Sequence, residues 1–243
     1  MKLFGYIFIL TFSISCFSQG ETGTVVYGLV STLNNSKIDS VQQSSSRIKN
    51  QMVAKLLADS KHADPLNFEL VYTSNRAYFK PLHNKHSQGQ MTILKIASIA
   101  SGAFFYDFEK SISINIFEYR NLRFHVEDSL SQFNWSLTNE TKYIGNYLCY
   151  KATGQRLFYA SQTDQYHPVP LEAWFTHDIP ISAGPDGVGG LPGLILELNL
   201  RTRTYFALKI SFDDVLYIPS PDKEKVISRS EYNALKRQLY LKQ

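Results

Sequence analysis

The sequence predicts a mainly β fold of the α+β class: a curved antiparallel β-meander with one amphipathic helix near the N-terminus and one C-terminal helix. Apolar and polar residues alternate in many short segments, which is the period of a half-buried strand. Short turn signals separate these segments along the chain. The chain also contains 15 Tyr and 16 Phe, and aromatic residues are enriched in strands.

The expected strands follow one another with short connections. The alternation is clearest over residues 111–117 and 121–128. Strands of this length and spacing favour an antiparallel meander with one buried face. The same pattern recurs over residues 67–72, 133–137, 142–144, 147–151, 172–176, 194–200 and 204–212, with turns expected at residues 74–75, 138–140, 145–146 and 201–202.

Near the N-terminus the apolar period changes from two to about four. Ile48, Met52 and Leu56 recur four residues apart after a run of serines. Because serine is a preferred N-cap and this spacing places all three side chains on one helix face, we expect an amphipathic helix over about residues 46–60.

A second helix is expected at the C-terminus. Ser228 and Glu231 form a capping-box pattern, in which each side chain binds a backbone N–H group of the other residue. Apolar residues at helical spacing follow, with two cations expected on the outer side: Tyr232, Leu235 and Leu239, then Lys236 and Arg237.

The first 18 residues resemble a secretory signal peptide. Lys2 precedes an apolar run over residues 3–12, and the small residues Cys16 and Ser18 precede Gln19. We therefore expect residues 1–18 to be removed and the protein to be exported, ending in the periplasm, at the outer membrane or outside the cell. A lipoprotein signal ending at Cys16 is the alternative.

Residues 19–243 are expected to form a single β-rich domain, because no composition shift or linker divides them. No later segment has the roughly 20 apolar residues of a transmembrane helix, so no membrane span is predicted. The net charge is only +4 and the cations are scattered along the chain, which argues against a nucleic-acid partner.

Residues 184–193 are rich in glycine and proline and lead directly into a strand of alternating leucines. Proline fixes φ and glycine permits positive φ, so this loop can turn sharply twice within few residues. Neither phosphate-loop pattern, GxGxxG or GxxxxGK[ST], is present. The loop is therefore expected to deliver the chain into a central apolar strand.

The C-terminal half of the sequence contains, in this order, Trp135 and the segments ETKYIGNYLCYKAT, AWFTHDIPISAGP and GLPGLILEL. This combination resembles the GLPGLI family, also called the Porph_ging domain, of exported proteins from Bacteroidota. It implies a secreted or periplasmic protein of unknown biochemical function, associated with outer-membrane or other envelope proteins. It assigns no catalytic residue.

The polar residues near the GLPGLILEL segment match no established catalytic or metal-binding motif. His177 with His167, Asp178 and Asp186 could bind a metal, but their spacing matches no zinc pattern. Asp178 with Glu197 is the best acid–base pair, although carboxylates at such positions more often stabilise turns. Cys149, alone after removal of the signal peptide, is expected in the core. We assign no catalytic, metal-binding or cofactor-binding residue and expect no cofactor.

Glu197 lies between two leucines of a predicted strand. It either faces water or, if buried, must be paired. The favoured interpretation is that Glu197 lies on a solvent-exposed face of the sheet. If Glu197 is buried, its candidate partners are Lys151, Arg156 and Lys209.

Three classes of function remain open. The favoured class is a non-catalytic binding module that docks an envelope or outer-membrane protein through the glycine- and proline-rich loop. A carrier of a hydrophobic ligand is the alternative, with a cavity lined by Phe104, Phe105, Ile114 and Trp174. A metal-dependent or acid–base hydrolase is the third. The candidate binding residues are Trp174, His177, Asp178, Pro185, Asp186, Gly190, Leu191, Pro192, Gly193 and Glu197.

Overall fold

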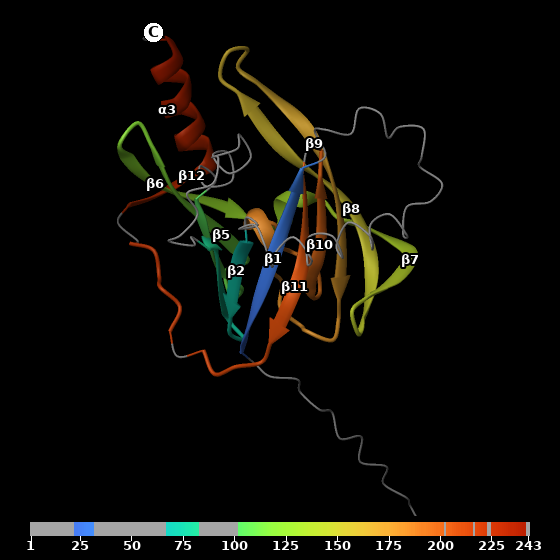
Figure 1. Cartoon of the computed structure of the whole chain (residues 1–243). Helices are drawn as coiled ribbons and strands as arrows, with labels where there is room; N and C mark the ends of the chain where they lie inside the picture. Colours follow the sequence, from blue (N-terminus) through green and yellow to red (C-terminus); the bar gives the residue numbers. More distant parts are fainter. Residues whose placement is uncertain are drawn as a thin grey trace, which may run out of the picture.

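The computed structural model of the chain describes residues 22–31, 67–82, 102–201, 203–215, 217–222 and 225–241. Within them the protein is mainly β, with one sheet of 12 strands and a C-terminal α-helix (Figure 1). The expected helix over residues 46–60 and the expected signal peptide over residues 1–18 lie outside the described residues.

The strands run through the sheet in the order β12-β6-β5-β4-β3-β2-β1-β11-β10-β9-β8-β7. In chain order, the first six strands are β1 (Gly23–Ser31), β2 (Asn67–Tyr72), β3 (Arg76–Leu82), β4 (Ala103–Asp107), β5 (Ile112–Tyr119) and β6 (Leu122–Ser129). The 3-10 turn η1 (Leu130–Phe133) leads to β7 (Ser136–Ile144), β8 (Tyr147–Ala160) and β9 (Gln165–Thr176). The 3-10 turn η2 (Pro185–Gly187) precedes β10 (Leu194–Leu200), β11 (Arg203–Ser211), β12 (Val226–Ser228) and α3 (Arg229–Leu241).

The sheet is mixed, whereas the sequence predicted an antiparallel one. Along the strand order, every adjacent pair from β6 through to β7 is antiparallel. The exception is β12, which pairs with β6 in parallel, with Val226 opposite His125. The prediction of a turn at residues 138–140 is wrong as well, because these residues continue β7. The pairing of β7 with β8 is irregular at these residues, with a shift in register between Leu137 and Thr141.

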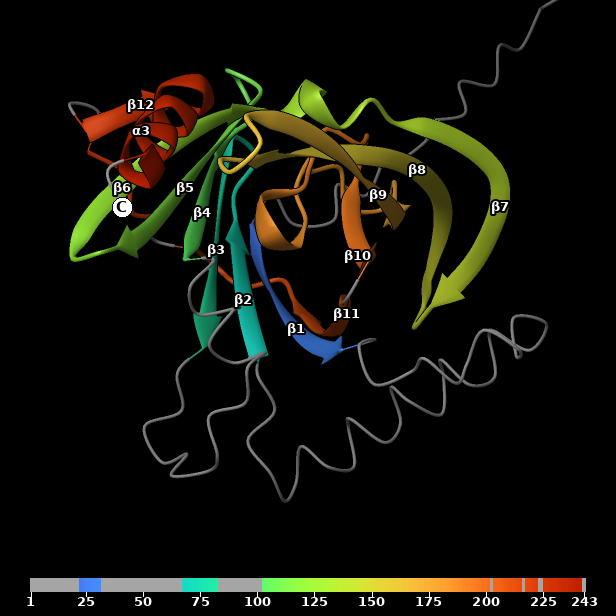
Figure 2. The same cartoon turned by 90° about the horizontal axis from the view of Figure 1, so that it is seen from above.

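The sheet curls strongly, and a short connection requires this. In the strand order β6 and β7 stand ten steps apart, which would be roughly 48 Å in a flat sheet at about 4.8 Å per step. The chain passes from Ser129 to Ser136 in seven residues, which can span roughly 25 Å at most. The two ends of the sheet are therefore brought toward one another, as Figure 2 shows.

The connection between β9 and β10, residues 177–193, lies inside this curl (Figure 2), and we call it the plug loop. Its apolar side chains join the main core, together with the leucines of β10. Long-range hydrogen bonds hold its backbone: the Tyr106 hydroxyl donates to the Gly184 carbonyl at 2.6 Å, and Trp135 Nε1 donates to the Gly189 carbonyl at 2.8 Å. The loop therefore fills the interior that the curl creates.

The C-terminal helix α3 begins as the sequence predicted. The Ser228 N–H group donates to Glu231 Oε2 at 2.7 Å, and the Glu231 N–H group donates to Ser228 Oγ at 3.2 Å. The prediction that Lys236 and Arg237 lie on the outer side is wrong. Lys236 Nζ donates to the Tyr159 carbonyl at 3.3 Å and Arg237 donates to the Ser161 carbonyl, so both cations bind the hairpin formed by β8 and β9.

Isoleucines of β5 do not face the plug loop. Ile114 packs with Phe105 of β4 and Ile218 in a second, smaller apolar cluster. Phe105 pairs with Ile114 across the two strands, and Phe104 pairs with Asn115. Because side chains alternate along a strand, Ser113 and Asn115 lie on the opposite face from Ile114. This is the face that Phe104 and Tyr106 share. The inner face of the curl therefore changes from apolar to polar at β5.

Gly187 should tolerate no larger residue, because it has a positive φ of 75° and an added Cβ would collide with the Phe104 ring. We expect Gly187→Ala to lower the free energy of unfolding in urea by about 2–4 kcal/mol, from overpacking and left-handed backbone together. Gly145→Ala is the matched control: its φ is 59° but no atom lies within 4 Å of the added Cβ, so only the backbone cost of about 1 kcal/mol applies. Equal losses in the two variants would contradict the packing of Phe104 on the loop.

His125 on β6 gives the fold a pH dependence. It is only 5% exposed, and neither ring nitrogen has a hydrogen-bond partner among the described residues. Burial lowers the pKa of His125, although the nearby backbone and charge of Asp222 act in the opposite direction. The unfolded chain therefore binds a proton more readily than the folded protein does.

Because the folded pKa is depressed, the stabilisation is complete above about pH 6.5, the ordinary value for histidine, and is lost as the pH falls below it. We expect the free energy of unfolding to decline between pH 7 and pH 5, and His125→Phe to flatten that part of the curve. Urea unfolding at a series of pH values measures this. Replacement of the exposed His167 by Phe should leave the decline unchanged, and an identical decline in the His125→Phe variant would contradict the assignment.

Candidate binding cleft

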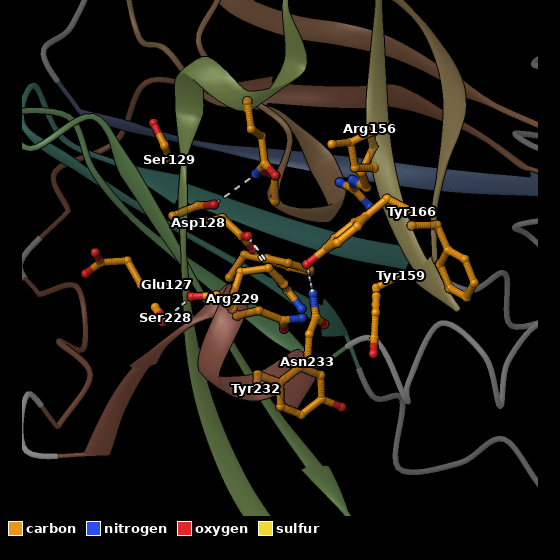
Figure 3. A pocket seen from close by; sticks show the side chains of 18 of the residues that line it. Glu127, Asp128, Ser129, Arg156, Tyr159, Tyr166, Ser228, Arg229, Tyr232 and Asn233 are labelled. Carbon is orange, nitrogen blue, oxygen red and sulfur yellow. Dashed lines mark hydrogen bonds and ion pairs between the residues drawn. The ribbon is translucent and has the colours of Figure 1, made fainter. Parts of the chain in front are cut away.

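A cavity of about 600 Å³ opens where β5 and β6, the hairpin of β8 and β9, the plug loop and α3 meet (Figure 3). Its walls carry mostly polar and charged side chains. Those used below are Ser113, Asn115, Asp128, Arg156, Phe158, Tyr159, Tyr166, Asp186, Arg203, Arg229, Ser230, Asn233 and Lys236. We call this cavity the cleft.

A buried carboxylate anchors the inner wall of the cleft. Asp186 Oδ2 accepts hydrogen bonds from Arg156 Nη1 on β8 and Arg203 Nη2 on β11, both at 2.9 Å. Arg156 Nη2 also donates to the Asp186 backbone carbonyl at 2.6 Å. Asp186 is 1% exposed and has a left-handed backbone, with φ 59° and ψ 32°. A charge buried this deeply requires such pairing.

The carboxylate also acts on the buried tyrosines around it. Burial, and after it the negative charge of Asp186, raises the pKa of both Tyr106 and Tyr205. Both phenols therefore remain protonated at physiological pH. The Tyr106 hydroxyl uses its proton to bind the plug-loop backbone at Gly184.

A second ion pair joins α3 to the sheet. Arg229 donates to both carboxylate oxygens of Asp128, with Nε to Oδ1 at 2.9 Å and Nη2 to Oδ2 at 2.5 Å. Such bidentate pairs fix the orientation of the guanidinium group. Burial alone would lower the pKa of Arg229, but the bonds to Asp128 more than offset it, and the pKa is raised.

Aromatic side chains form the outer wall. The rings of Tyr159 and Tyr166 lie with their centroids 5.2 Å apart. The Tyr166 hydroxyl accepts a hydrogen bond from Asn233 Nδ2 at 3.1 Å, and the Tyr159 hydroxyl donates to Asp164 Oδ1 at 2.6 Å. Phe158 and Tyr166 remain 56% and 52% exposed, so their faces are available at the mouth of the cleft.

Of the ten predicted site residues, only Asp186 lines the cleft. Pro185, Leu191 and Gly193 are buried in the plug loop, and Gly190 and Pro192 are exposed on it. His177 and Asp178 are exposed at its start. Nδ1 of His177 lies 2.8 Å from the Pro192 carbonyl oxygen, while the Asp178 N–H group donates to Thr176 Oγ1.

Glu197 and Trp174 lie together on another part of the sheet. The prediction that Glu197 faces water is wrong: it is 4% exposed, and Lys142 Nζ lies 2.5 Å from its Oε2. Lys142 was not among the three predicted partners. The same ammonium group lies 4.2 Å from the centroid of the Trp174 ring, an arrangement typical of a cation–π contact.

The structure also bears on the expectations for a metal site, for Cys149 and for a hydrophobic cavity. No three His, Cys, Asp or Glu side chains gather at a possible metal site in the part of the chain that the structure describes. Cys149 is buried as predicted, and its burial raises its pKa to about 12. The four residues expected to line a hydrophobic cavity are divided: Phe105 and Ile114 belong to the second apolar cluster, Phe104 reaches the cleft, and Trp174 contacts Lys142.

Sequence reasoning named Asp186 but missed the arginines of the cleft and the second carboxylate, Asp128. The three arginines Arg156, Arg203 and Arg229 carry no motif, and their partners are distant in the sequence. The polar positions of the predicted strand over residues 111–117 did carry a signal. Had they been considered as an inner face, they would have indicated a polar interior at β5.

A family model described as "Protein of unknown function (Porph_ging)" matches residues 160–197. The match covers β9, the plug loop and the first part of β10, and thus includes Asp186. No curated protein matches the sequence.

Among solved structures, PNGF-II resembles this chain in two crystal forms. In space group C2 the identity is 13% and the TM-score 0.50, over 89% of this chain and 32% of PNGF-II. In space group P21 the identity is 13% and the TM-score 0.51, over 88% of this chain and 33% of PNGF-II. The chain spans about a third of the length of PNGF-II, and at this identity the likeness concerns the fold alone.

We expect Asp186→Asn to destabilise the protein by about 3 kcal/mol, because two partly buried guanidinium groups lose the carboxylate they share. Urea unfolding measures the loss. Glu118→Gln is the control, since Glu118 is exposed and surface substitutions usually change the stability by less than about 0.5 kcal/mol. A loss of less than about 1 kcal/mol in the Asp186 variant would contradict the anchoring role.

Proposed function

We propose that the chain is an exported, non-catalytic binding module of the cell envelope, and that its ligand site is the cleft. The proposal of export rests on the signal-peptide pattern of residues 1–18 and on the family resemblance. The matching family model is one of unknown function. None of the described helices has the length and apolar character needed to cross a bilayer.

The observation that carries the proposal is the preorganised polar lining of a cavity large enough for a small ligand. The volume of about 600 Å³ lies within the usual range for ligand pockets. The charged groups Asp186 and Asp128 are already held by arginines, and Asn233 is held by Tyr166. Side chains fixed before binding lose little conformational entropy when a ligand arrives.

The lining favours a ligand that combines polar or charged groups with apolar parts over the purely hydrophobic one considered as the alternative. Hydroxyl, amide, carboxylate and guanidinium groups face the cavity, and apolar contact is offered mainly by the rings at its mouth. The apolar interior of the sheet is occupied by the plug loop. A hydrophobic carrier would need that interior to be vacant.

The plug loop contributes in a different way from the docking surface that the sequence suggested. Its backbone and most of its side chains are buried, and its Asp186 supports the cleft. The exposed residues His177, Asp178, Gly190 and Pro192 provide a small additional surface. We propose this surface as a secondary contact for an envelope protein.

Narrowing the cleft tests the proposal. Ser230, in the first turn of α3, lines the cleft, so we expect the indole of Ser230→Trp to occupy the space that a ligand needs. Native mass spectrometry of the protein isolated from the envelope of its source should show a bound mass for the wild type and the loss of that mass in this variant.

Ala234→Trp is the matched control, because Ala234 is exposed on the same helix and does not line the cleft. This variant should retain the bound mass. If the bound mass is still present in Ser230→Trp, the ligand binds outside the cleft. If the wild-type protein shows no bound mass after incubation with envelope extract, the proposed binding function is contradicted.

A further inference from the structure

The inner wall of the cleft has an excess of positive charge. Arg156 and Arg203 share the single carboxylate of Asp186, so this cluster carries a net charge of 2 − 1 = +1. The pair formed by Asp128 and Arg229 is neutral. Counting all charged residues of the lining gives four cations and three acids, which is again 4 − 3 = +1.

The two arginines also have unused hydrogen-bond donors. Each guanidinium group has five N–H donors, which is ten for the pair. Three of them bind Asp186, two from Arg156 and one from Arg203. The other seven have no acceptor among the described residues. Four of these donors belong to nitrogens without any bond, Arg156 Nε and Arg203 Nε and Nη1, and none of these three nitrogens is fully buried. Both side chains line the cleft, so a ligand in the cavity can reach these four donors.

Lys236 adds a third cation to the same cavity. Its ammonium group donates one hydrogen bond to the Tyr159 carbonyl and lies 5.4 Å from the centroid of the Phe158 ring. It forms no ion pair with a described carboxylate. An acceptor bound in the cleft can use the remaining donors of Lys236 if it extends from the arginines toward the aromatic wall.

We propose that Arg156 and Arg203 form a subsite for an oxyanion, a carboxylate, phosphate or sulfate group carried by the polar ligand of the cleft. This inference rests on the proposed function and specifies the chemical class of the ligand. An oxyanion there neutralises the excess charge and accepts charge-assisted hydrogen bonds from two guanidinium groups that Asp186 already holds in place. The aromatic rings at the mouth of the cleft contact the remainder of the ligand.

Simple anions test the subsite without knowledge of the whole ligand. The thermal transition of the wild-type protein is measured during titration with sodium phosphate, sulfate or acetate, and with sodium chloride at matched ionic strength. We expect at least one oxyanion to raise the melting temperature above the chloride curve, because a ligand that binds only the folded state stabilises it. The responding anion distinguishes a tetrahedral group from a carboxylate.

Arg203→Gln removes one of the two cations and leaves Arg156 to pair with Asp186. We expect the dissociation constant of the responding anion to rise about tenfold, the effect of losing one hydrogen bond to a charged group. Lys209→Gln is the matched control, since it removes one charge from the exposed part of the same strand. Equal affinities in these two variants would overturn the proposal.

A measurement on the wild type avoids dependence on the folding of the variant. Arginine Nε–H resonances recorded by NMR should move on addition of the oxyanion and not on addition of chloride. If no oxyanion shifts either the resonances or the melting temperature beyond chloride, the subsite does not exist. If a native bound mass is nevertheless lost in Ser230→Trp, the proposed binding function holds and only the anionic character of the ligand is refuted.

Discussion

The short connection between β6 and β7 is the constraint on which the rest of the structure depends. It forces a sheet of 12 strands to bring its two ends together, and a curled sheet encloses an interior that must be filled. The chain fills it with its own backbone, the plug loop between β9 and β10. Glycine is needed where this backbone passes close to its neighbours, as at Gly187 against Phe104. The glycine- and proline-rich signature is thus explained by packing.

Filling the interior with a loop places a charge there, and this links the core to the cleft. Asp186 lies on the plug loop, and its burial requires cations that strands β8 and β11 supply. The same arginines form the inner wall of the cleft. Stability and the proposed binding therefore depend on one cluster, and the family match that covers the plug loop covers its central carboxylate. Under the proposed function, a change at Asp186 should alter both stability and binding.

Local features of the sequence predicted their structures well. The capping box at Ser228 and Glu231, the burial of Cys149 and the strands of alternating residues depend on neighbours close in the chain or on side-chain character. Long-range features could not be predicted. The partner of Glu197 lies 55 residues away, and Lys236 and Arg237 face a hairpin more than 70 residues earlier. Nor does alternation alone tell which face of β5 is the inner one, since Ile114 packs against Ile218 on the opposite face.

The position of β1 in the middle of the sheet has a consequence for the order of assembly. β1 pairs on one side with β2 and on the other with β11, where Val25 lies opposite Ile210. Contacts between residues so distant in sequence form slowly, because the intervening chain must first be closed into a loop. The segments β2–β6 and β7–β11 can each form from strands that are neighbours in the sequence. The pairing of β1 with β11 then joins the two halves and encloses the plug loop, so that β1, the first of the described strands in chain order, is among the last to be completed.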